Sequence, residues 1–289
     1  MREVDIATAK SQYIPGEAVE GQLVVRCDKE FQYNAIYLAF TGGERTEIVV
    51  SSGDSSTTYR DERVYFTDRR DFEGNGVMAP GETQFPFRFL VPDDVPCSYS
   101  GKCGWVEYAL TGVVEVSWAR DPKRKTTIEV RRPMKPPTSQ SRSQSIDKDG
   151  YPEFDAEVEE DCVCLGNSVK LRFRVARDVK IRGIRAELRT EEHAIAKRQK
   201  SKRTWTLVKE YMEEPEIGRD LWMNVELKTH ESMPISFEGE IVSNRSSVKV
   251  TLDIPWALDK SIVIPIQLGH YAPPSASDEA IRSHGRWSI

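Results

Sequence analysis

Apolar and polar side chains alternate in many short segments of this 289-residue chain. Successive side chains of a β-strand point to opposite faces, so each alternating segment predicts a strand with one buried face and one wet face. No segment places apolar residues at helical spacing over several turns. The clearest strand predictions cover residues 36–40, 85–91, 106–118, 169–175, 248–254 and 262–268.

Turn-forming residues separate these predicted strands. Examples are Pro15-Gly16, Gly42-Gly43, Pro80-Gly81 and Pro92-Asp93. Many short strands with frequent turns are typical of β-sandwiches or barrels, and a chain of this length has room for two such domains.

The alternation stops between Pro133 and Pro152, where proline, serine and charged residues replace it. This composition is typical of a linker between domains. We therefore predict an all-β chain of two tandem immunoglobulin-like β-sandwich domains. The first covers residues 1–135 and the second 154–270, with a linker at 136–153 and a tail at 271–289.

The composition favours a cytoplasmic protein. The N-terminus lacks an apolar signal region, and no apolar run approaches the roughly 20 residues that a membrane-spanning helix needs. The five cysteines do not form a disulfide framework, and Cys162 and Cys164 have no second ligand pair at zinc spacing. Aromatic and basic residues do not interleave as they do on a nucleic-acid-binding surface. We expect no metal, cofactor or nucleic acid.

Catalytic motifs are missing from the sequence. It contains no nucleophile elbow, phosphate-binding loop or H-E-x-x-H pair, and the four histidines have no partner at a telling spacing. The carboxylates are too many for one acid/base pair to stand out. We therefore expect no catalytic residue and no enzyme.

Two segments of the first half match motifs of one known protein family. Residues Tyr13 to Gly21 are similar to the Y-x-P-G-E-x-V-x-G start of the α-arrestin subfamily. Residues Pro80 to Leu110 resemble the family's F-x-F strand, its P-x-x-x-P-x-S loop and the glycine turn into an aromatic strand.

Two further segments extend the resemblance to the second half. Residues 162–175, with 181–188, resemble the opening strands of the arrestin C-domain, and residues 246–269 resemble its last hairpin. The chain is identified as arrestin-like and closest to the α-arrestin subfamily. The resemblance implies an arrestin N-like sandwich followed by a C-like one.

The resemblance also implies a non-enzymatic adaptor that links cytoplasmic regions of membrane proteins to trafficking or signalling machinery. The alternatives are a retromer-type coat subunit, a prokaryotic arrestin-like stress protein, or a sandwich that binds carbohydrate or another small ligand. An aromatic-lined groove with convergent polar groups would favour the ligand-binding sandwich. Two features depart from the family: neither Pro136-Pro137 nor Pro273-Pro274 continues into P-P-x-Y, and residues 233–246 are too few for the long charged loop of β-arrestins.

One arginine matches a position that is part of a charge cluster between the domains of arrestins. Arg131 follows a strand-like segment at 127–130, and Asp253 or Glu240 would be its carboxylate partners. The alternative is that Arg131 is solvated at the end of its strand.

A basic cluster lies between two predicted strands of the second half. It contains Lys197, Arg198, Lys200, Lys202 and Arg203. We predict a hairpin tip there that contacts an anionic surface, either phospholipid head groups or a phosphorylated protein, so the protein would be peripheral to a membrane. The alternative is a solvated turn balanced by Glu191 and Glu192.

Overall fold

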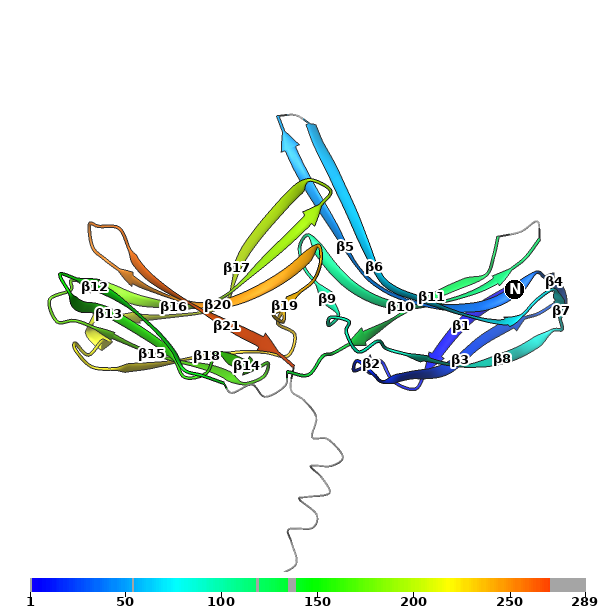
Figure 1. The fold of residues 1–289 in the computed structure, drawn as a ribbon, viewed down its shortest axis with the longest axis horizontal. Coiled ribbons are helices and arrows are strands. Elements are labelled where there is room, and N and C mark those ends of the chain that lie inside the picture. Colours follow the sequence, from blue (N-terminus) through cyan, green and yellow to red (C-terminus); the bar gives the residue numbers. More distant parts are fainter. Residues whose placement is uncertain (1, 54, 118–119, 135–138, 271–289) are drawn as a thin grey trace, which may run out of the picture. The chain divides into compact units, whose positions relative to one another are not determined.

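The computed structural model describes residues 2–53, 55–117, 120–134 and 139–270, and these residues form β-sheets (Figure 1). They belong to two compact units. The first contains residues 1–132 together with two later segments, 194–201 and 238–242, and the second contains the remaining residues from 133 onward. The prediction of an all-β fold with two sandwiches is confirmed.

The first unit has two main sheets. One has the strand order β1-β3-β8, and the other has the order β2-β11-β10-β5-β6 with β9 paired to β10. A small sheet joins β4 and β7. The strands are β1 (Arg2–Thr8), β2 (Gln12–Tyr13), β3 (Ala18–Cys27), β4 (Phe31–Tyr33), β5 (Ala35–Ser52), β6 (Ser55–Glu73), β7 (Gly76–Met78), β8 (Gly81–Leu90), β9 (Tyr99–Ser100), β10 (Gly104–Glu115) and β11 (Lys123–Val130).

The later strands form two further sheets. One has the order β12-β13-β15-β18, and the other has the order β14-β21-β20-β16-β17 with β19 paired to β20. The strands are β12 (Arg142–Lys148), β13 (Tyr151–Val158), β14 (Cys162–Cys164), β15 (Ser168–Val175), β16 (Gly183–Ala196), β17 (Gln199–Glu213), β18 (Met223–Lys228), β19 (Phe237–Glu238), β20 (Val242–Asp253) and β21 (Lys260–Gly269).

The only helix among the described residues is η1 (Glu214–Glu216), a single turn. No described helix therefore has the length or the apolar character to cross a membrane.

The inward faces of the two sheets form the core of each unit. In the first unit, the rings of Phe40 on β5 and Phe89 on β8 lie 5.7 Å apart and join the sheets. Gly112 on β10 lets the sheets approach, since a Cβ there would lie 2.3 Å from the Leu23 side chain. In the second unit, Phe154 and Phe173 are fully buried. The alternating apolar residues thus supply the core, as their spacing predicts.

The proline-rich loop after β8 is fastened to the six-stranded sheet. The Tyr108 hydroxyl donates a hydrogen bond to the carbonyl of Pro96 at 2.6 Å. Ser98 exchanges two hydrogen bonds with the backbone of Val130 on β11. The loop with the P-x-x-x-P-x-S pattern therefore runs along β11, and hydrogen bonds between the two satisfy backbone N–H and C=O groups of both.

Gly42 and Gly43 are not a turn, although the sequence predicted one there. They lie inside β5, which pairs with β6 through a register shift at this point, so that Tyr65 has no residue opposite it. A Cβ on Gly43 would lie 2.5 Å from the carbonyl oxygen of Arg63, so the glycine lets the bulged strand come close. Glycine is common both in β-bulges and in turns, so the sequence alone does not distinguish a bulge from a turn at Gly42-Gly43.

Part of the segment that we predicted as a linker is a strand. Residues 142–148 form β12, which pairs with β13. Its side chains are exposed on both faces apart from Ile146, so no apolar alternation marks the strand in the sequence. The domain boundaries stay a prediction, and the tail at 271–289 lies outside the described residues.

Candidate functional site

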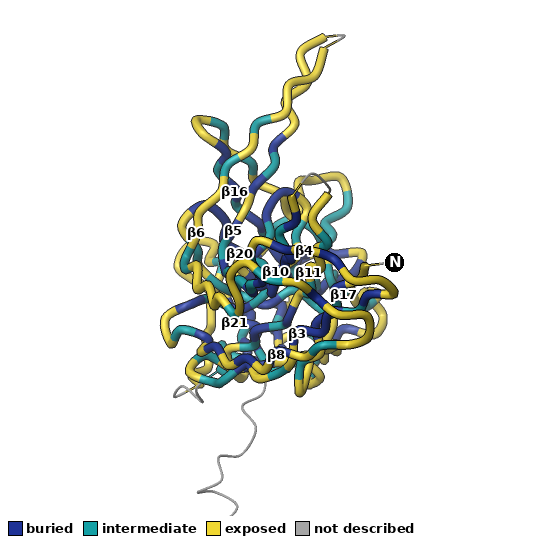
Figure 2. The backbone as a smooth tube through the Cα atoms, turned by 90° about the vertical axis from the view of Figure 1, so that its right-hand side faces the viewer, coloured by how far each residue is buried: buried dark blue, intermediate teal, exposed yellow. Residues whose placement is uncertain are grey.

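Strands β5 and β6 form a long hairpin in the first unit (Figure 1). Its base alternates between buried and half-buried residues, whereas the last residues of β5 are exposed. Figure 2 shows this end in yellow at the top, where it projects away from the buried segments drawn in dark blue. Val49 is 51% exposed and Val50 is 39% exposed, although both are apolar. A long hairpin with an exposed apolar end is suited to contact with another molecule.

A carboxylate lies on the buried face of this hairpin. Glu44 on β5 is 1% exposed and continues the row of buried side chains that begins with Ile36. Its two oxygens accept hydrogen bonds from the backbone N–H groups of Glu240 at 2.6 Å, Ile241 at 3.2 Å and Val242 at 3.0 Å. Three convergent N–H groups form a concave site for an anion, which here is the Glu44 carboxylate.

Two glycines make room for this contact within the first unit. A Cβ on Gly239 would lie 2.5 Å from Oε2 of Glu44, and a Cβ on Gly104 would lie 2.2 Å from the Val242 side chain. Residues 238–242, which we name the amide segment, therefore fit closely over β5 and β10.

Other polar side chains surround the carboxylate. Burial raises the pKa of the Tyr65 hydroxyl, and the charge of Glu44 raises it further, so this phenol stays protonated. Nε of Arg63 lies 3.9 Å from the Glu240 carboxylate. Backbone donors thus stabilise the buried charge, and no cation of the described residues pairs with it.

The second later segment of the first unit, residues 194–201, also contacts β5. The Thr46 hydroxyl donates a hydrogen bond to the carbonyl of Ile195 at 2.6 Å. Next to it, Ile48 and Cys103 form a small buried cluster with Ala194 and Ala196. These contacts complete the core of the unit with residues that are far away in the sequence.

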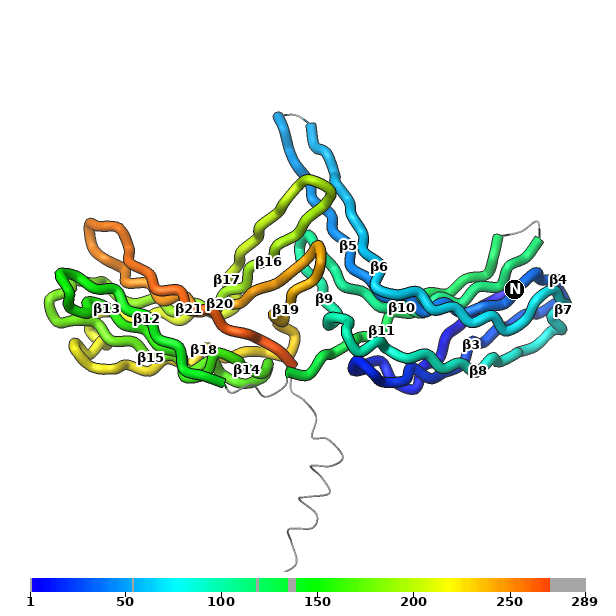
Figure 3. The backbone as a smooth tube through the Cα atoms, in the orientation of Figure 1, coloured from blue at the N-terminus to red at the C-terminus, as the bar shows by residue number. Residues whose placement is uncertain are grey.

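The predicted basic cluster lies at the turn that joins β16 and β17, which Figure 3 shows in yellow-green. Lys197 has a positive φ of 57°, and its backbone N–H donates to the Asp61 carboxylate at 3.2 Å. This N–H lowers the pKa of Asp61, and so does the N–H of Glu62.

The five basic side chains at this turn differ in their partners. Lys202 forms an ion pair with Glu191 at 2.9 Å. Among the described residues no carboxylate pairs with Lys197, Arg198, Lys200 or Arg203, and all four are exposed. Most of the positive charge at the turn is therefore available to an external anion.

The residues of the predicted polar cluster have other contacts. Nε of Arg131 lies 2.7 Å from Oε1 of Glu129, and Arg131 is about one quarter exposed. Asp253 pairs with Arg182 and accepts a hydrogen bond from Tyr211 at 3.3 Å. Glu240 contributes its backbone N–H to the Glu44 site. Arg131 and Asp253 belong to different units, and their pairing stays a prediction.

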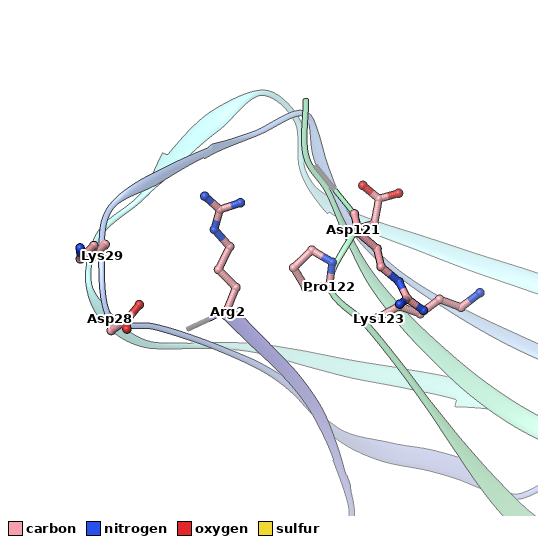
Figure 4. A pocket seen from close by; sticks show the side chains of 7 residues that line it. Arg2, Asp28, Lys29, Asp121, Pro122 and Lys123 are labelled. Carbon is pink, nitrogen blue, oxygen red and sulfur yellow. The ribbon is translucent and has the colours of Figure 1, made fainter. Parts of the chain in front are cut away.

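A polar pocket of about 600 Å³ lies at one end of the first unit (Figure 4). Arg2, Lys29, Arg120 and Lys123 line it together with Asp28 and Asp121. One oxygen of Asp121 is already occupied, because it accepts the N–H of Val116 at 2.9 Å. The excess of cations gives this pocket the chemistry to attract a small anion.

A second groove, of about 640 Å³, contains aromatic residues, as a carbohydrate site would. However, the Arg45 guanidinium lies 5.2 Å from the Trp105 ring, and Tyr108 is fully buried with its hydroxyl bonded to Pro96. Arg45 therefore covers one face of Trp105, and Tyr99 and Tyr108 are buried, so the described aromatic rings of this groove give little support to the ligand-binding sandwich.

Sequence reasoning missed Glu44, although a signal for it exists. Positions 36, 38 and 40 are apolar, and the same period continues through Glu44 to Ile48. A carboxylate at one of the alternate positions that face the core needs hydrogen-bond donors from elsewhere in the protein. Its donors lie almost two hundred positions away in the chain, which the sequence does not show.

Comparisons with known proteins agree with this fold. Residues 2–136 match the family model described as "Arrestin (or S-antigen), N-terminal domain". Human "Arrestin domain-containing protein 1" is 27% identical over 112 residues, which is 39% of this chain and 25% of the relative. "Arrestin domain-containing protein 17" of Caenorhabditis elegans is 22% identical over 41% of this chain and 31% of its own length.

A relative from Schizosaccharomyces pombe aligns over a longer part of the chain. Its name is "Putative arrestin-related trafficking adapter", and it is 27% identical over 201 residues, or 54% of this chain and 30% of the relative. The alignments thus cover about a quarter to a third of these relatives. Residues 2–136 thus match an arrestin N-terminal domain, and the chain is distantly similar to the arrestin domain-containing proteins.

Proposed function

We propose that this protein is a non-enzymatic adaptor that binds cytoplasmic regions of membrane proteins and links them to trafficking or signalling machinery. The single observation that carries the proposal is the arrestin N-terminal domain at residues 2–136. The name of the Schizosaccharomyces pombe relative, a trafficking adapter, supports the same role. The protein acts in the cytoplasm and is peripheral to membranes.

The surface of the first unit supports a binding role. The β5–β6 hairpin presents exposed Val49 and Val50 at its far end. The Glu44 site and the Thr46 contact hold its base, so the exposed part projects from a base that is hydrogen-bonded to other segments of the first unit.

Proximity labelling with the full chain in its host would test the adaptor role. We expect enrichment of integral membrane proteins with cytoplasmic tails, together with trafficking or signalling proteins. A variant with Val49→Ser and Val50→Ser should lose part of this set, whereas Val77→Ser, which replaces another exposed valine of the same unit, should not. Enrichment of soluble metabolic enzymes alone would contradict the proposal.

The basic turn contributes an electrostatic contact to this function. Lys197, Arg198 and Lys200 are exposed and have no carboxylate partner among the described residues. Each cation near an anionic membrane adds about 1 kcal/mol of attraction. The turn therefore brings the protein weakly and reversibly to acidic phospholipid.

Co-sedimentation with liposomes tests this contact. Replacing Lys197, Arg198 and Lys200 by Ser should reduce recovery with vesicles that contain phosphatidylserine, and rising salt should do the same to the native chain. The matched control replaces Arg26, Arg60 and Arg88 by Ser, because these arginines lie on the surface, Arg26 only partly exposed, and are already paired with carboxylates. Equal recovery of both variants would show that the basic cluster does not bind the membrane and is only a solvent-exposed turn.

A further inference from the structure

Strand β18 is the last strand of its sheet in the second unit. It pairs with β15 on one side, and no described strand pairs with its other side. A strand at a sheet edge presents unpaired N–H and C=O groups, to which an extended peptide can add. Six residues of β18 offer about 20 Å of such an edge.

The pairing register fixes which side chains of β18 face the core. Val225 lies opposite Leu171, which is buried, and Asn224 and Glu226 lie opposite Arg172 and Lys170. Val225 therefore faces inward, and Asn224 and Glu226 face outward. An added strand would place its own side chains in the same alternation.

Each side of this edge is hollowed. On the inner side, a groove of about 350 Å³ runs between β17 and β18, and its apolar walls come from Phe173, Ile184, Ala186, Met212 and Val225. On the outer side, a second depression of about 520 Å³ is lined by Lys170, Arg172, Asn224 and Glu226 among others. An added strand would thus find space for an apolar side chain inward and for polar side chains outward.

The charges that line the inner groove are negative, whereas β18 itself ends in the exposed Lys228. Glu210, Glu216 and Glu226 line the inner groove, and no basic residue does. On the outer side, Lys170 and Arg172 are already paired with Glu159 and Glu157. No described cation pairs with Glu210 or Glu226. Lysine or arginine next to the apolar residue of a peptide should therefore strengthen its binding to this edge.

We propose that the free edge of β18 binds an extended peptide with the pattern basic-apolar-basic. The peptide backbone pairs with residues 223–228, the apolar side chain enters the groove between β17 and β18, which Glu210 also lines, and the outward basic side chains meet Glu226. This surface does not include the basic turn or the β5–β6 hairpin, so the failure of either proposal leaves the other standing.

A synthetic heptapeptide of alternating lysine and valine, labelled with a fluorophore, is the probe. Fluorescence anisotropy with the full chain should show saturable binding, and hydrogen exchange should show new protection of the amides of residues 223–228. A peptide of the same sequence with alternate backbone nitrogens methylated should bind about tenfold more weakly or worse, because it cannot complete the ladder.

Charge reversal then tests the groove itself. The double change Glu210→Lys and Glu226→Lys should weaken binding by about tenfold or more. The matched control, Glu160→Lys and Glu231→Lys, changes net charge equally at exposed positions that do not line the groove, and should bind like the native chain. Equal binding of the methylated peptide, equal binding by both charge variants, or no binding by the native chain would overturn the proposal.

Discussion

Glu44 is an acidic side chain on a face that apolar side chains otherwise fill. An uncompensated buried carboxylate would cost several kcal/mol, so its hydrogen bonds decide whether the face is stable. Three backbone N–H groups supply them, and two of these three bonds are fully buried. The carboxylate and the amide segment therefore satisfy each other's hydrogen-bonding groups. Burial of either one here without the other would be unfavourable.

Replacing Glu44 by Ala should destabilise the first unit. The N–H groups of Ile241 and Val242 would stay buried without an acceptor, at a cost of about 1–3 kcal/mol each. Chemical unfolding should show the loss, and amide exchange should rise first at residues 240–242. Glu47→Ala on the same strand is the control, because its exposed pair with Arg60 contributes less than about 1 kcal/mol. Similar losses in the two variants would show that the amides do not depend on Glu44.

Tyr33 should make stability depend on alkaline pH. Its hydrogen bond to Glu73, with burial and the charge of that carboxylate, raises the pKa of Tyr33 from 10.0 to about 12. A raised pKa means that the folded chain holds the proton more tightly than the unfolded chain. The resulting stabilisation is therefore complete below pH 10 and is lost as the pH rises towards 12.

The comparison of the native chain with Tyr33→Phe isolates this effect, because other tyrosines titrate in both proteins. The difference in unfolding free energy between the two should shrink between pH 10 and pH 12. A difference that stays constant over this interval would mean that Tyr33 titrates normally.

At the scale of elements, the two units repeat one arrangement. A short strand runs parallel to the last strand of the six-stranded sheet, as β2 does beside β11 and β14 beside β21. A glycine with positive φ follows each short strand, Gly16 at 81° and Gly166 at 94°, and the chain then enters the other sheet. The motif around Pro15-Gly16 predicted this turn because only glycine adopts such a φ without strain.

Elements without an alternating pattern could not be predicted. Strand β12 exposes both faces, so its residues resemble a linker, and its pairing with β13 comes from backbone bonds that any residue can make. Apolar alternation in β5, β8, β15 and β21 reports burial directly, and these strands were predicted from sequence. Sequence patterns thus locate the core and miss the polar edges.

Replacing Gly16 by Ala should destabilise the first unit by about 1–2 kcal/mol or more. The positive φ strains any L side chain, and the new Cβ would lie 2.5 Å from Oδ1 of Asp93. Gly74→Ala is the control, because Gly74 has no positive φ in this range and no atom near its Cβ position. Thermal unfolding of both variants checks the prediction, and equal midpoints would contradict it.

At the scale of the whole molecule, the first unit is not one continuous stretch of chain. Residues 194–201 and 238–242 belong to it although they follow residue 132 by many positions. The composition break at Pro133 could suggest a boundary, but contacts such as Thr46 to Ile195 depend on where distant strands lie. Neither the alternation of apolar residues nor the turn residues show which distant segments contact each other. The sequence therefore predicted that the basic turn belongs only to the second domain.

A fragment of residues 1–132 should therefore be less stable than the same residues in the full chain. It lacks the acceptor for the Thr46 hydroxyl and the donors for Glu44, and it exposes Ile48 and Cys103, which are buried against Ala194 and Ala196. Amide exchange along β5 and β10 measures local stability in both proteins and should be faster in the fragment. The decisive comparison is Glu44→Ala. In the full chain this change leaves buried amides unpaired, whereas in the fragment those amides are missing and the change should cost little or even stabilise. If Glu44→Ala accelerates exchange equally in both proteins, the carboxylate stabilises the first domain by itself, and the later segments are not part of its fold.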